Sequence, residues 1–394
     1  MSSVTLGDLA QAGVLILGDG YRTKRSEHGR PGLRILRVAD VADGVVSPRG
    51  QDFISEGYRD RIGIKLAQPD DVLLTTKGTV GRVARMPATT EPFVYSPQLC
   101  FFRVLDPAVL STRFLELWFR SHAFASQASH RANNTDMAAY INLADIRSLR
   151  LELPSEREQR AITEVLGALD DKIAANARLR RSAVQLATTL AGGAEPSVPL
   201  ESLVVHHRQQ LSPHQFGALD LHHFSIPAFD AAEVPEIARP ATIKSGKFQI
   251  RQPSVLVSKL NPRFPRVWDV SQPPGTLAVA STEFLVLESR FTSSSVLWAV
   301  LSQPHFGAAL EEKAAGTSGS HQRVRPADLL ATLVADPREL EDRRKAAITD
   351  LGRRIASSRM ESQGLARLRD ALLPPLMSGK LRVKEAERVV GEVV

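Results

Sequence analysis

The stretch that decides the fold is LPSEREQRAITEVLGALDDKIAANARLRRSAVQLATTL, which runs from Leu153 to Leu190. Ser155 and Glu158 have the spacing of a capping box, in which the two side chains satisfy free N–H groups at the start of a helix. Apart from one glycine, neither Gly nor Pro then interrupts the sequence until Gly192. The pattern predicts one helix over 157–190, roughly 50 Å long at about 1.5 Å per residue.

One face of this helix is apolar in steps of three and four residues, which is typical of a coiled-coil seam. The seam consists of Ile162, Leu166, Leu169, Ile173, Ala183, Ala187 and Leu190. Asn176 stands within it, where a buried amide fixes the register of the pairing at some cost in stability.

A degraded copy of the stretch returns from Ala335 onwards. In both copies a strand-like run ends at a proline, Pro154 or Pro337, and the triplet Ala-Ile-Thr follows. Upstream, INLADIRSL matches VRPADLLATL, DDVLLTTKG matches PSVLVSKLN, and LWFRSHAF matches LWAVLSQPHF. The offset stays close to about 185 residues, far longer than the period of a solenoid repeat. We interpret the chain as a duplicated unit in the order domain, helix, domain, helix; the alternative is coincidence among common residues.

The second long helix carries a comparable stripe, although its first half is highly charged and Gly352 and Gly364 weaken it. The stripe consists of Ile348, Leu351, Ile355, Leu365, Leu368, Leu372 and Leu376. Because neither helix hides its stripe alone, we expect the two to pair as an antiparallel coiled coil related by a pseudo-two-fold axis. The alternative is that each helix packs on its own domain.

Composition bounds the class of protein. Of 394 residues, 43% are hydrophobic and 24% charged, as in globular proteins. No apolar run approaches the roughly 18 residues of a membrane span, and the N-terminus has no signal-peptide pattern. The single cysteine, Cys100, excludes an internal disulfide, so we expect a reducing, cytoplasmic location. The net charge of +7 favours a polyanionic partner such as nucleic acid, although the protein could simply be basic.

Both halves mix short strand-like runs with Gly, Pro, Asn and Ser turns and short helices, which predicts α+β domains. At one corresponding place the first half has TTKGTVGRVARM and the second has SKLNPRFPRVW. Both loops are cationic but differ in detail, as two readers of different DNA half-sites would require. For any single basic residue, a phosphate contact or a solvated surface charge is the more ordinary interpretation.

The candidate DNA contacts are basic, amide and histidine residues of predicted loops. They are Arg22, Lys24, Arg25, Lys77, Arg82, Arg85, Asn134, Lys259, Asn261, Arg263, Arg266 and His321.

Motifs for catalysis are missing from the sequence. NPRF at Asn261 has Arg263 where an amino-methyltransferase motif needs a second proline, and PDDVLLTTK has Thr75 where a nuclease site needs an acid. There is no Walker A motif. The five histidines between 206 and 223 lack metal-ligand spacing, so we interpret them as surface or core-edge residues. We therefore expect no catalytic residues, no metal and no cofactor.

The segment NNTDMAAYINLADIRSLRLELPSEREQRAITEVLGALDDKIAANARL resembles the central segment of the specificity (S, HsdS) subunits of Type I restriction–modification systems. DDVLLTTKGTVGRVARM and VLVSKLNPRFPRVW are similar to segments of the family's target recognition domains, so the resemblance covers essentially the whole chain. In the second repeat, TSGSHQRVRP and EDRRKAAI depart from the family pattern.

The resemblance implies target recognition domains over 1–154 and 193–337, a central spacer helix over 155–192, a C-terminal spacer helix over 338–378 and a tail over 379–394. It implies a non-catalytic subunit that reads a bipartite, asymmetric site in double-stranded DNA. Its partners would be two modification (methyltransferase) subunits and, in a full complex, two restriction subunits. The alternatives are a self-contained nuclease or methyltransferase, and a coiled-coil adaptor or DNA-binding protein of another phage-defence system.

Overall fold

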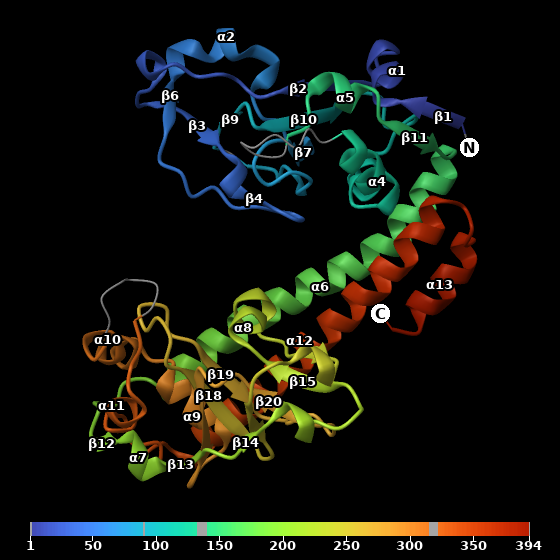
Figure 1. Ribbon diagram of the computed structural model, residues 1–394. Coiled ribbons are helices and arrows are strands. Elements are labelled where there is room, and N and C mark those ends of the chain that lie inside the picture. The colour runs from blue at the N-terminus through green and yellow to red at the C-terminus, as the bar shows by residue number, and fades with distance from the viewer. Residues whose placement is uncertain (1, 90, 132–139, 315–321, 394) are drawn as a thin grey trace. The chain divides into compact units, whose positions relative to one another are not determined.

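The computed structural model describes residues 2–89, 91–131, 140–314 and 322–393. The chain divides into two compact units, unit 1 with Met1–Asp170 and Arg367–Val394, and unit 2 with Asp171–Ala366. Both units mix helices and strands, as expected for the α+β class (Figure 1).

Unit 1 is built on an antiparallel four-stranded sheet in the order β2-β10-β7-β8. Its strands are β2 (Leu15–Asp19), β10 (Leu99–Val104), β7 (Val72–Thr75) and β8 (Val83–Arg85). The strands β7 and β10 are short continuous apolar runs that are buried along almost their whole length. Such runs form central strands because both faces of the sheet are covered. The core here includes Leu73, Tyr95 and Phe101.

The remaining elements of unit 1 surround this sheet. A three-stranded sheet has the order β6 (Phe53–Ser55), β3 (Gly32–Leu36), β9 (Phe93–Tyr95), and two small ladders pair β1 (Ser2–Thr5) with β11 (Arg150–Leu153) and β4 (Val41–Ala42) with β5 (Val45–Val46). The short helices are α1 (Leu6–Gln11), α2 (Arg59–Ile62), α3 (Thr112–Phe119), α4 (His122–Arg131) and α5 (Leu143–Arg147).

Unit 2 repeats the plan of unit 1. Its four-stranded antiparallel sheet has the order β13 (Val204–His207), β21 (Phe284–Ser289), β18 (Ser254–Ser258), β19 (Val267–Val270). A second sheet has the order β14 (Gln210–Leu211), β17 (Lys247–Ile250), β20 (Ala278–Ala280), β15 (Leu221–Phe224), β16 (Glu236–Ala238), and β12 (Val198–Pro199) pairs with β22 (Leu333–Val334). The helices are α7 (Leu200–Leu203), α8 (Ile226–Ala232), α9 (Ser294–Leu301), α10 (Pro304–Glu312) and α11 (Pro326–Leu330).

The correspondence between the units extends to pairing details. Among the described residues, each unit has one parallel pair of strands, β3 with β9 in unit 1 and β15 with β20 in unit 2. Each also has an isolated antiparallel bridge at the same place in its chain order, Lys77 with Tyr140 and Leu260 with Arg323. The same sheet order, the same parallel pair and the same bridge support the predicted duplication. Unit 2 differs in the added strands β14 and β17.

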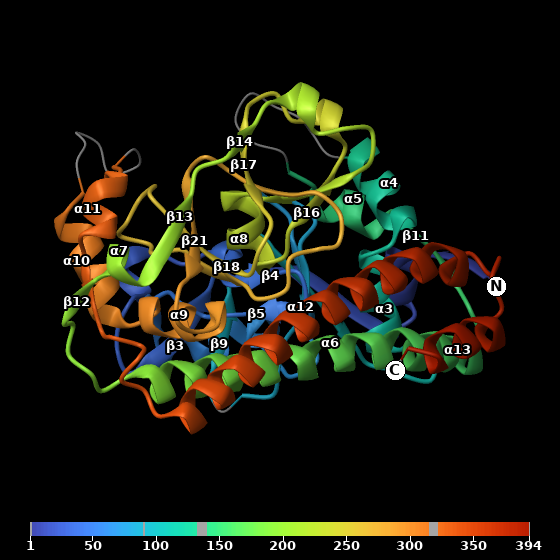
Figure 2. The ribbon, with the colours of Figure 1, turned by 90° about the horizontal axis from the view of Figure 1, so that it is seen from below.

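The two long helices are α6 (Glu156–Ala191) and α12 (Asp342–Met377), which pack together as predicted (Figures 1 and 2). The predicted capping box is present, because the Glu158 carboxylate accepts from the Ser155 N–H at 3.0 Å and the Glu158 N–H donates to Ser155 Oγ at 3.4 Å. In unit 2, Asn176 Nδ2 donates to Glu361 Oε2 at 2.9 Å and Arg180 Nη1 donates to Ser362 Oγ at 3.1 Å.

The direction of pairing follows from contacts in both units. In unit 1, Arg369 Nη1 donates to Asp170 Oδ1 at 2.8 Å. Asp170 comes before Asn176 in α6, whereas its partner Arg369 comes after Glu361, the partner of Asn176, in α12. The helices are therefore antiparallel. Asn176 is 7% exposed and its side-chain amide donates to Glu361, so this amide is buried and hydrogen-bonded rather than solvated. The Asn176 backbone carbonyl also accepts from Ser358 Oγ at 3.4 Å.

The seam is shared between helix pairing and the domain core. In unit 2, Ala183, Ala187, Ile348 and Ile355 belong to one buried cluster with strands β18 and β21 and helix α9. Ile162, Leu166 and Leu169 are at most 2% exposed in unit 1, whereas Ile173 and Leu190 are only half-buried. Leu365 and Leu372 of α12 are also buried. The two alternatives considered for the stripe are thus not exclusive, because each helix also packs on globular elements.

Gly352 lowers the helix propensity of α12, but it also permits a close approach between α12 and the start of α9. A Cβ added there would lie 2.1 Å from Ser295 Oγ and 2.5 Å from Ser295 Cβ, at the start of α9. At the corresponding Gly167 of α6, the nearest atom would be the flexible end of Arg113, at 2.8 Å. The two glycines therefore differ in how easily a neighbour can move.

We expect Gly352→Ala to lower the free energy of unfolding by about 1–3 kcal/mol through overpacking. Gly167→Ala is the matched control and should cost less, because the Arg113 guanidinium can swing away and alanine favours the helix. Urea denaturation followed by far-UV circular dichroism measures both. Equal effects of the two substitutions would contradict this account of Gly352.

The tail contains a helix for which the sequence analysis made no prediction. It is α13 (Val383–Gly391), which buries Ala386 and Val390 and belongs to unit 1 (Figure 2). None of the helices in the described part of the chain combines the length and apolar character needed to cross a lipid bilayer.

Candidate nucleic-acid interface

In each unit, the loop after the second core strand along the sequence is joined by an isolated bridge to a residue much further along the chain. Lys77, just after β7, bridges to Tyr140, and Leu260, just after β18, bridges to Arg323. The structure thereby places the two predicted basic loops beside Tyr140 and Arg323. The candidates Asn134 and His321 lie outside the described residues.

The loop of unit 1, residues 76–82, is a glycine turn between β7 and β8. Gly78 and Gly81 have φ values of 83° and 98°, which residues with a side chain rarely adopt. The Gly81 N–H donates to the Thr75 carbonyl at 3.0 Å, and the Arg82 N–H donates to Thr75 Oγ1 at 2.9 Å. Thr75, which stands where a nuclease would need an acid, therefore closes this turn, and Lys77 is exposed at its edge.

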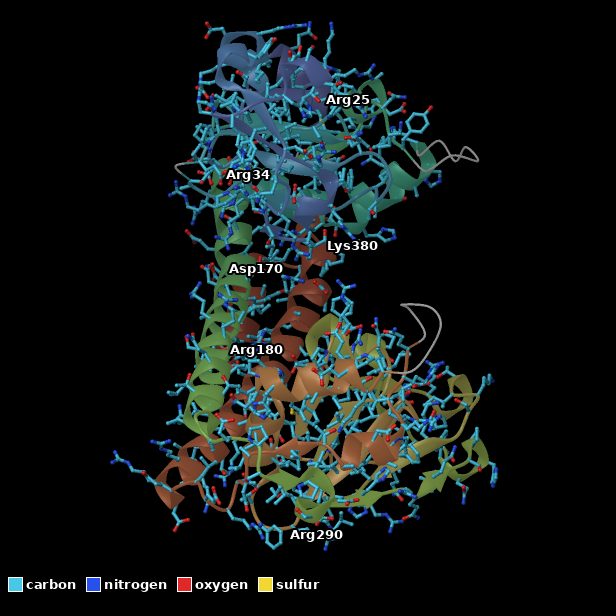
Figure 3. The ribbon with its side chains drawn as sticks, turned by 90° about the vertical axis from the view of Figure 1, so that its left-hand side faces the viewer. Arg25, Arg34, Asp170, Arg180, Arg290 and Lys380 are labelled. Atoms are coloured by element: carbon cyan, nitrogen blue, oxygen red, sulfur yellow. The ribbon has the colours of Figure 1, made fainter. Side chains whose placement is uncertain are left out.

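Three further candidates of unit 1 follow the end of β2. Because β2 and β7 both pair antiparallel with β10, they end at the same edge of the sheet. Arg22, Lys24 and Arg25 are exposed beyond that edge, on the globular part of unit 1 (Arg25 in Figure 3). The structure thus brings these residues to the same edge as Lys77.

Besides Lys77, the segment TTKGTVGRVARM contains two arginines, Arg82 and Arg85, and both have protein partners. Arg82 is half-buried and its Nη1 donates to the Val41 carbonyl at 3.4 Å. Arg85 pairs with Asp70 at 2.7 Å and lies 3.4 Å from the Glu116 carboxylate. A side chain that already has two acidic partners is less available to phosphate, so Lys77 is the stronger candidate in this loop.

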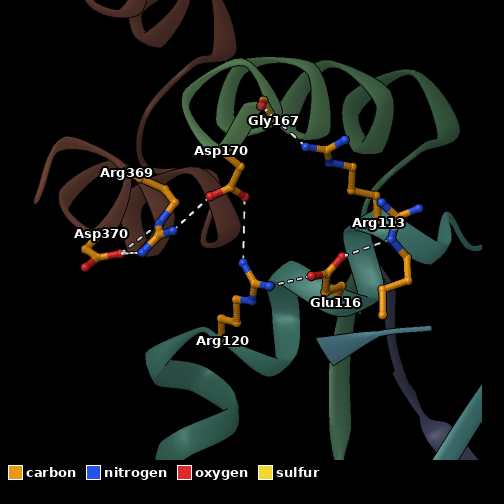
Figure 4. A network of polar contacts seen from close by, with 8 residues as sticks. Arg113, Glu116, Arg120, Gly167, Asp170, Arg369 and Asp370 are labelled. Carbon is orange, nitrogen blue, oxygen red and sulfur yellow. Dashed lines mark hydrogen bonds and ion pairs between the residues drawn. The ribbon is translucent and has the colours of Figure 1, made fainter. Parts of the chain in front are cut away.

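Glu116 continues into an ion-pair network that ties α3 to both long helices within unit 1 (Figure 4). Arg120 pairs with Glu116 and approaches Asp170 of α6 at 3.7 Å. Asp170 also accepts from Arg369 of α12, which contacts its neighbour Asp370 at 2.8 Å. The network positions elements of unit 1, and its arginines are not free cations.

The loop of unit 2, residues 259–266, is stiffened by Pro262 and Pro265. Asn261 has φ of 51°, and its N–H donates to the Gln322 carbonyl at 2.8 Å. Arg266 makes a bidentate contact with Asp230, at 2.6 and 2.9 Å. Lys259 is half-buried and Arg263 is exposed.

The structure adds basic residues that the sequence analysis had not included among the candidates. β13 and β18 both pair antiparallel with β21, so they end at one edge of the sheet, where His206 and Arg208 come close to Lys259. Arg208 Nε donates to His206 Nδ1 at 3.1 Å, which leaves the Nε2–H of His206 as a donor. Burial is the main cause that lowers the pKa of His206, and the positive charge of Arg208 is the next. In the sequence, the available signal was the cluster His206-His207-Arg208, which the structure places at the end of β13.

The carboxylate that suggested a nuclease site has another role. Asp71 is 1% exposed and accepts from the Tyr95 hydroxyl at 2.7 Å and from Arg103 Nε at 2.8 Å. It also accepts from Arg103 Nη2 at 2.7 Å and from the Gln68 N–H at 2.9 Å. Its oxygens are therefore occupied inside the core.

The histidines of unit 2 likewise lie in structural surroundings. His207 contacts Glu288 at 2.6 Å, and burial, followed by the positive charge of Lys247, lowers the pKa of His223 to about 4. Within the residues that the structure describes, no group of three or more His, Cys, Asp or Glu side chains could hold a metal ion.

Comparisons with known proteins agree with this picture. The family model "Type I restriction modification DNA specificity domain" matches residues 1–183. No curated protein matches the chain. Among solved structures, the S subunit of a Type I restriction-modification system from M. genitalium is similar at 13% identity and a TM-score of 0.57, over 95% of each chain.

Two further solved structures are similar at lower scores. The HsdS subunit from Thermoanaerobacter tengcongensis shares 17% identity over 96% of this chain and 97% of its own, with a TM-score of 0.36. A chain from a structure of "complex assembly and conformational transition of the type I R-M system" shares 18% identity over 96% and 98%, with a TM-score of 0.38. The likeness of fold is therefore stated for the M. genitalium subunit. Residues 1–183 thus match the family model of the Type I restriction modification DNA specificity domain, and the chain as a whole has the fold of the M. genitalium S subunit.

Proposed function

We propose that this chain is a non-catalytic DNA specificity subunit that reads a bipartite, asymmetric site and docks methyltransferase subunits. The observation that carries the proposal is the repetition of one sheet plan in two units whose corresponding basic loops differ. A protein with two identical readers would recognise a symmetric site, whereas unlike readers recognise unlike half-sites.

The differences between the two sheet edges support unlike readers. Unit 1 presents a glycine turn with Lys77 and an exposed basic run after β2. Unit 2 presents a proline-stiffened loop with Arg263, beside His206 and Arg208. Lysine and arginine contact phosphates and guanine edges, and a neutral histidine donates a hydrogen bond to a base or phosphate acceptor. The two edges therefore offer different donors to DNA.

The long helices are the proposed docking and spacing element. Leu179 and Leu186 of α6 lie seven residues apart on one face and are 45% and 50% exposed, and Met360 of α12 is 66% exposed. Exposed apolar residues on an otherwise charged helix are suited to a protein partner. We assign these exposed apolar residues of α6 and α12 to contacts with the methyltransferase subunits. Restriction subunits would join through that complex.

The test is genome-wide mapping of N6-methyladenine in a host that expresses this chain with its methyltransferase, compared with the methyltransferase alone. We expect methylation of one two-part motif that depends on this chain. A symmetric, continuous motif would contradict the bipartite proposal. Methylation by the purified chain alone with S-adenosylmethionine would show an enzyme, and equal binding of target and scrambled duplex would favour a protein adaptor.

We also expect the gap between the two parts of the motif to follow the length of the helix pair. Inserting seven residues after Asn176 in α6 and after Glu361 in α12 preserves the antiparallel match and nearly preserves the faces. It adds about 10 Å of helix, which corresponds to about three base pairs at roughly 3.4 Å each. Methylome sequencing reads the new gap. A seven-residue insertion at Gly379, in the turn between α12 and α13, is the control and should leave the gap unchanged.

A further inference from the structure

The loop after β18 presents an aromatic side chain on a stiff base. Pro262 is buried, and Pro265 lies against Gly307 of α10, where an added Cβ would come within 2.9 Å of its ring. The Phe264 N–H donates to the Asn261 carbonyl at 3.0 Å, and the Ser258 N–H donates to the Arg266 carbonyl at 2.9 Å. These contacts fix both ends of the loop and the turn at its tip.

Arg266 adds a further anchor from below the tip. Its guanidinium pairs with Asp230, just after the middle of α8, and its Nη1 donates to the Phe264 carbonyl at 3.3 Å. The backbone that carries Phe264 is thus held by side chains as well as by prolines. Little conformational freedom remains for the loop to lose on binding, which favours affinity.

Phe264 itself is 58% exposed despite this rigid setting. The Arg263 guanidinium lies 5.9 Å from its ring centroid, and Lys259, the first residue of the loop, lies on the same edge as His206 and Arg208. The positive charges of this edge are suited to a polyanion, and the exposed phenyl ring is suited to a polyanion that also has apolar surfaces. Stacked bases behind phosphates are that combination.

We infer that Phe264 inserts as an apolar wedge beside a base of the half-site that unit 2 reads, with Arg263 contacting the adjacent phosphate. This inference rests on the proposed function and adds a mode of readout to it. Inserted apolar side chains unstack neighbouring base pairs, so the cost of insertion depends on the sequence at that step. Unit 1 has Gly78, Thr79 and Val80 in the corresponding turn, so the wedge is confined to one half-site.

The chain offers a matched control in Phe291. It is 53% exposed, and the Arg338 guanidinium lies 5.0 Å from its ring centroid. Phe291 lies two residues beyond the end of β21, whereas the base of the Phe264 loop, at Lys259, contacts Glu283 just before β21 begins. The two phenylalanines are therefore associated with opposite ends of β21. Phe291 thus matches Phe264 in exposure and in having an arginine neighbour, but it differs in its position in unit 2.

The experiment uses the full chain and the duplex defined by its methylome. We expect Phe264→Ala to weaken binding of that duplex by about 5- to 140-fold, the range for loss of one base–aromatic contact. Phe264→Leu keeps a wedge and should lose less, and Phe291→Ala should stay within about twofold of the parent chain. Thermal melts of all variants verify that the fold is retained.

The second readout is 2-aminopurine fluorescence, because this base analogue brightens when it is unstacked. Placed in turn in each half of the duplex, it should brighten in one half with the parent chain and with Phe291→Ala, but not with Phe264→Ala. If the parent chain does not prefer the target duplex, the proposed function fails.

The remaining outcomes concern the wedge alone. Preference for the target together with unchanged affinity and fluorescence in Phe264→Ala overturns the wedge while the proposed function stands. Unchanged DNA binding with lost methylation in the complex would assign Phe264 to a protein contact, which also overturns the wedge.

Discussion

Replacing Asp71 with asparagine is expected to destabilise unit 1 by about 3–5 kcal/mol, because it leaves a buried arginine without its counter-charge. The Asp71 side chain is fully buried, the Arg103 side chain is 11% exposed, and the two make two hydrogen bonds of 2.7 and 2.8 Å. The Tyr95 hydroxyl would also lose a charged acceptor, and burial together with Asp71 raises the pKa of that hydroxyl far above its ordinary value.

Hydrogen-exchange mass spectrometry under increasing urea is the suitable measurement, because it resolves the two units separately. Peptides from β7 and β10 should lose protection, whereas peptides from β18 and β21 should not. The control is Asp70→Asn at the preceding residue, whose carboxylate is 65% exposed in its pair with Arg85. Asparagine also tolerates the positive φ of 67° at that position, so we expect little change.

The same pair of variants bears on the nuclease alternative. If Asp71→Asn retained the stability of the parent chain but removed a DNA-cleaving activity, Asp71 would be a catalytic acid, and our structural assignment would be wrong. A loss of stability without any activity to lose supports the core role.

Replacing Arg359 with methionine is the second large effect that we expect. The Arg359 side chain of α12 is 11% exposed and pairs with Glu233, the C-cap residue just after α8, and it also attracts the buried Asp269 carboxylate. Methionine retains much of the volume but leaves both carboxylates without this positive charge. We expect a loss of about 2–4 kcal/mol at pH 8.

The loss should depend on pH in a defined direction. Burial, the larger influence, raises the pKa values of Glu233 and Asp269, and the positive charge of Arg359 partly opposes this rise. Removing the Arg359 charge therefore raises both pKa values further. A carboxyl whose pKa is higher in the folded state favours folding when protonated, and this contribution is lost as pH rises through the folded-state pKa. The variant should therefore lose less stability near pH 5 than at pH 8.

Urea denaturation at the two pH values measures this effect. Arg353→Met is the control on the same helix, because Arg353 is 59% exposed in an i, i+3 pair with Asp350 and should contribute little. A loss in Arg359→Met that is independent of pH between 5 and 8 would contradict the account based on the two carboxylates.

Local patterns in the sequence were sufficient for the long helices and the duplication. The capping box at Ser155 and Glu158, the seven-residue seam and the order of matched segments each depend on neighbours in the chain or on direct repetition. Asn176 was placed in the seam by spacing alone, and the structure buries it against α12. Its partner Glu361 was not predicted, because identifying it requires the register of the two helices.

The candidate interface was predictable only in part. Spacing identified Lys77 and Lys259 as basic residues near turns, but it could not show that Arg85 is paired with Asp70 or that Arg266 is paired with Asp230. In the same way, nothing local distinguished Phe264, exposed on a stiff loop, from the buried Phe284. Such differences arise from contacts between residues far apart in the chain.

By itself, the sequence determined a twice-used α+β unit, two long amphipathic helices and a basic character without catalytic motifs, because these depend on periodicity, repetition and composition. Only the tertiary structure decided which charges remain free, why Gly352 must lack a side chain, and which strand ends share an edge. The physical reason is that burial and ion pairing are set by distance in space, and residues such as Asp71 and Arg103 meet only when the sheet has formed.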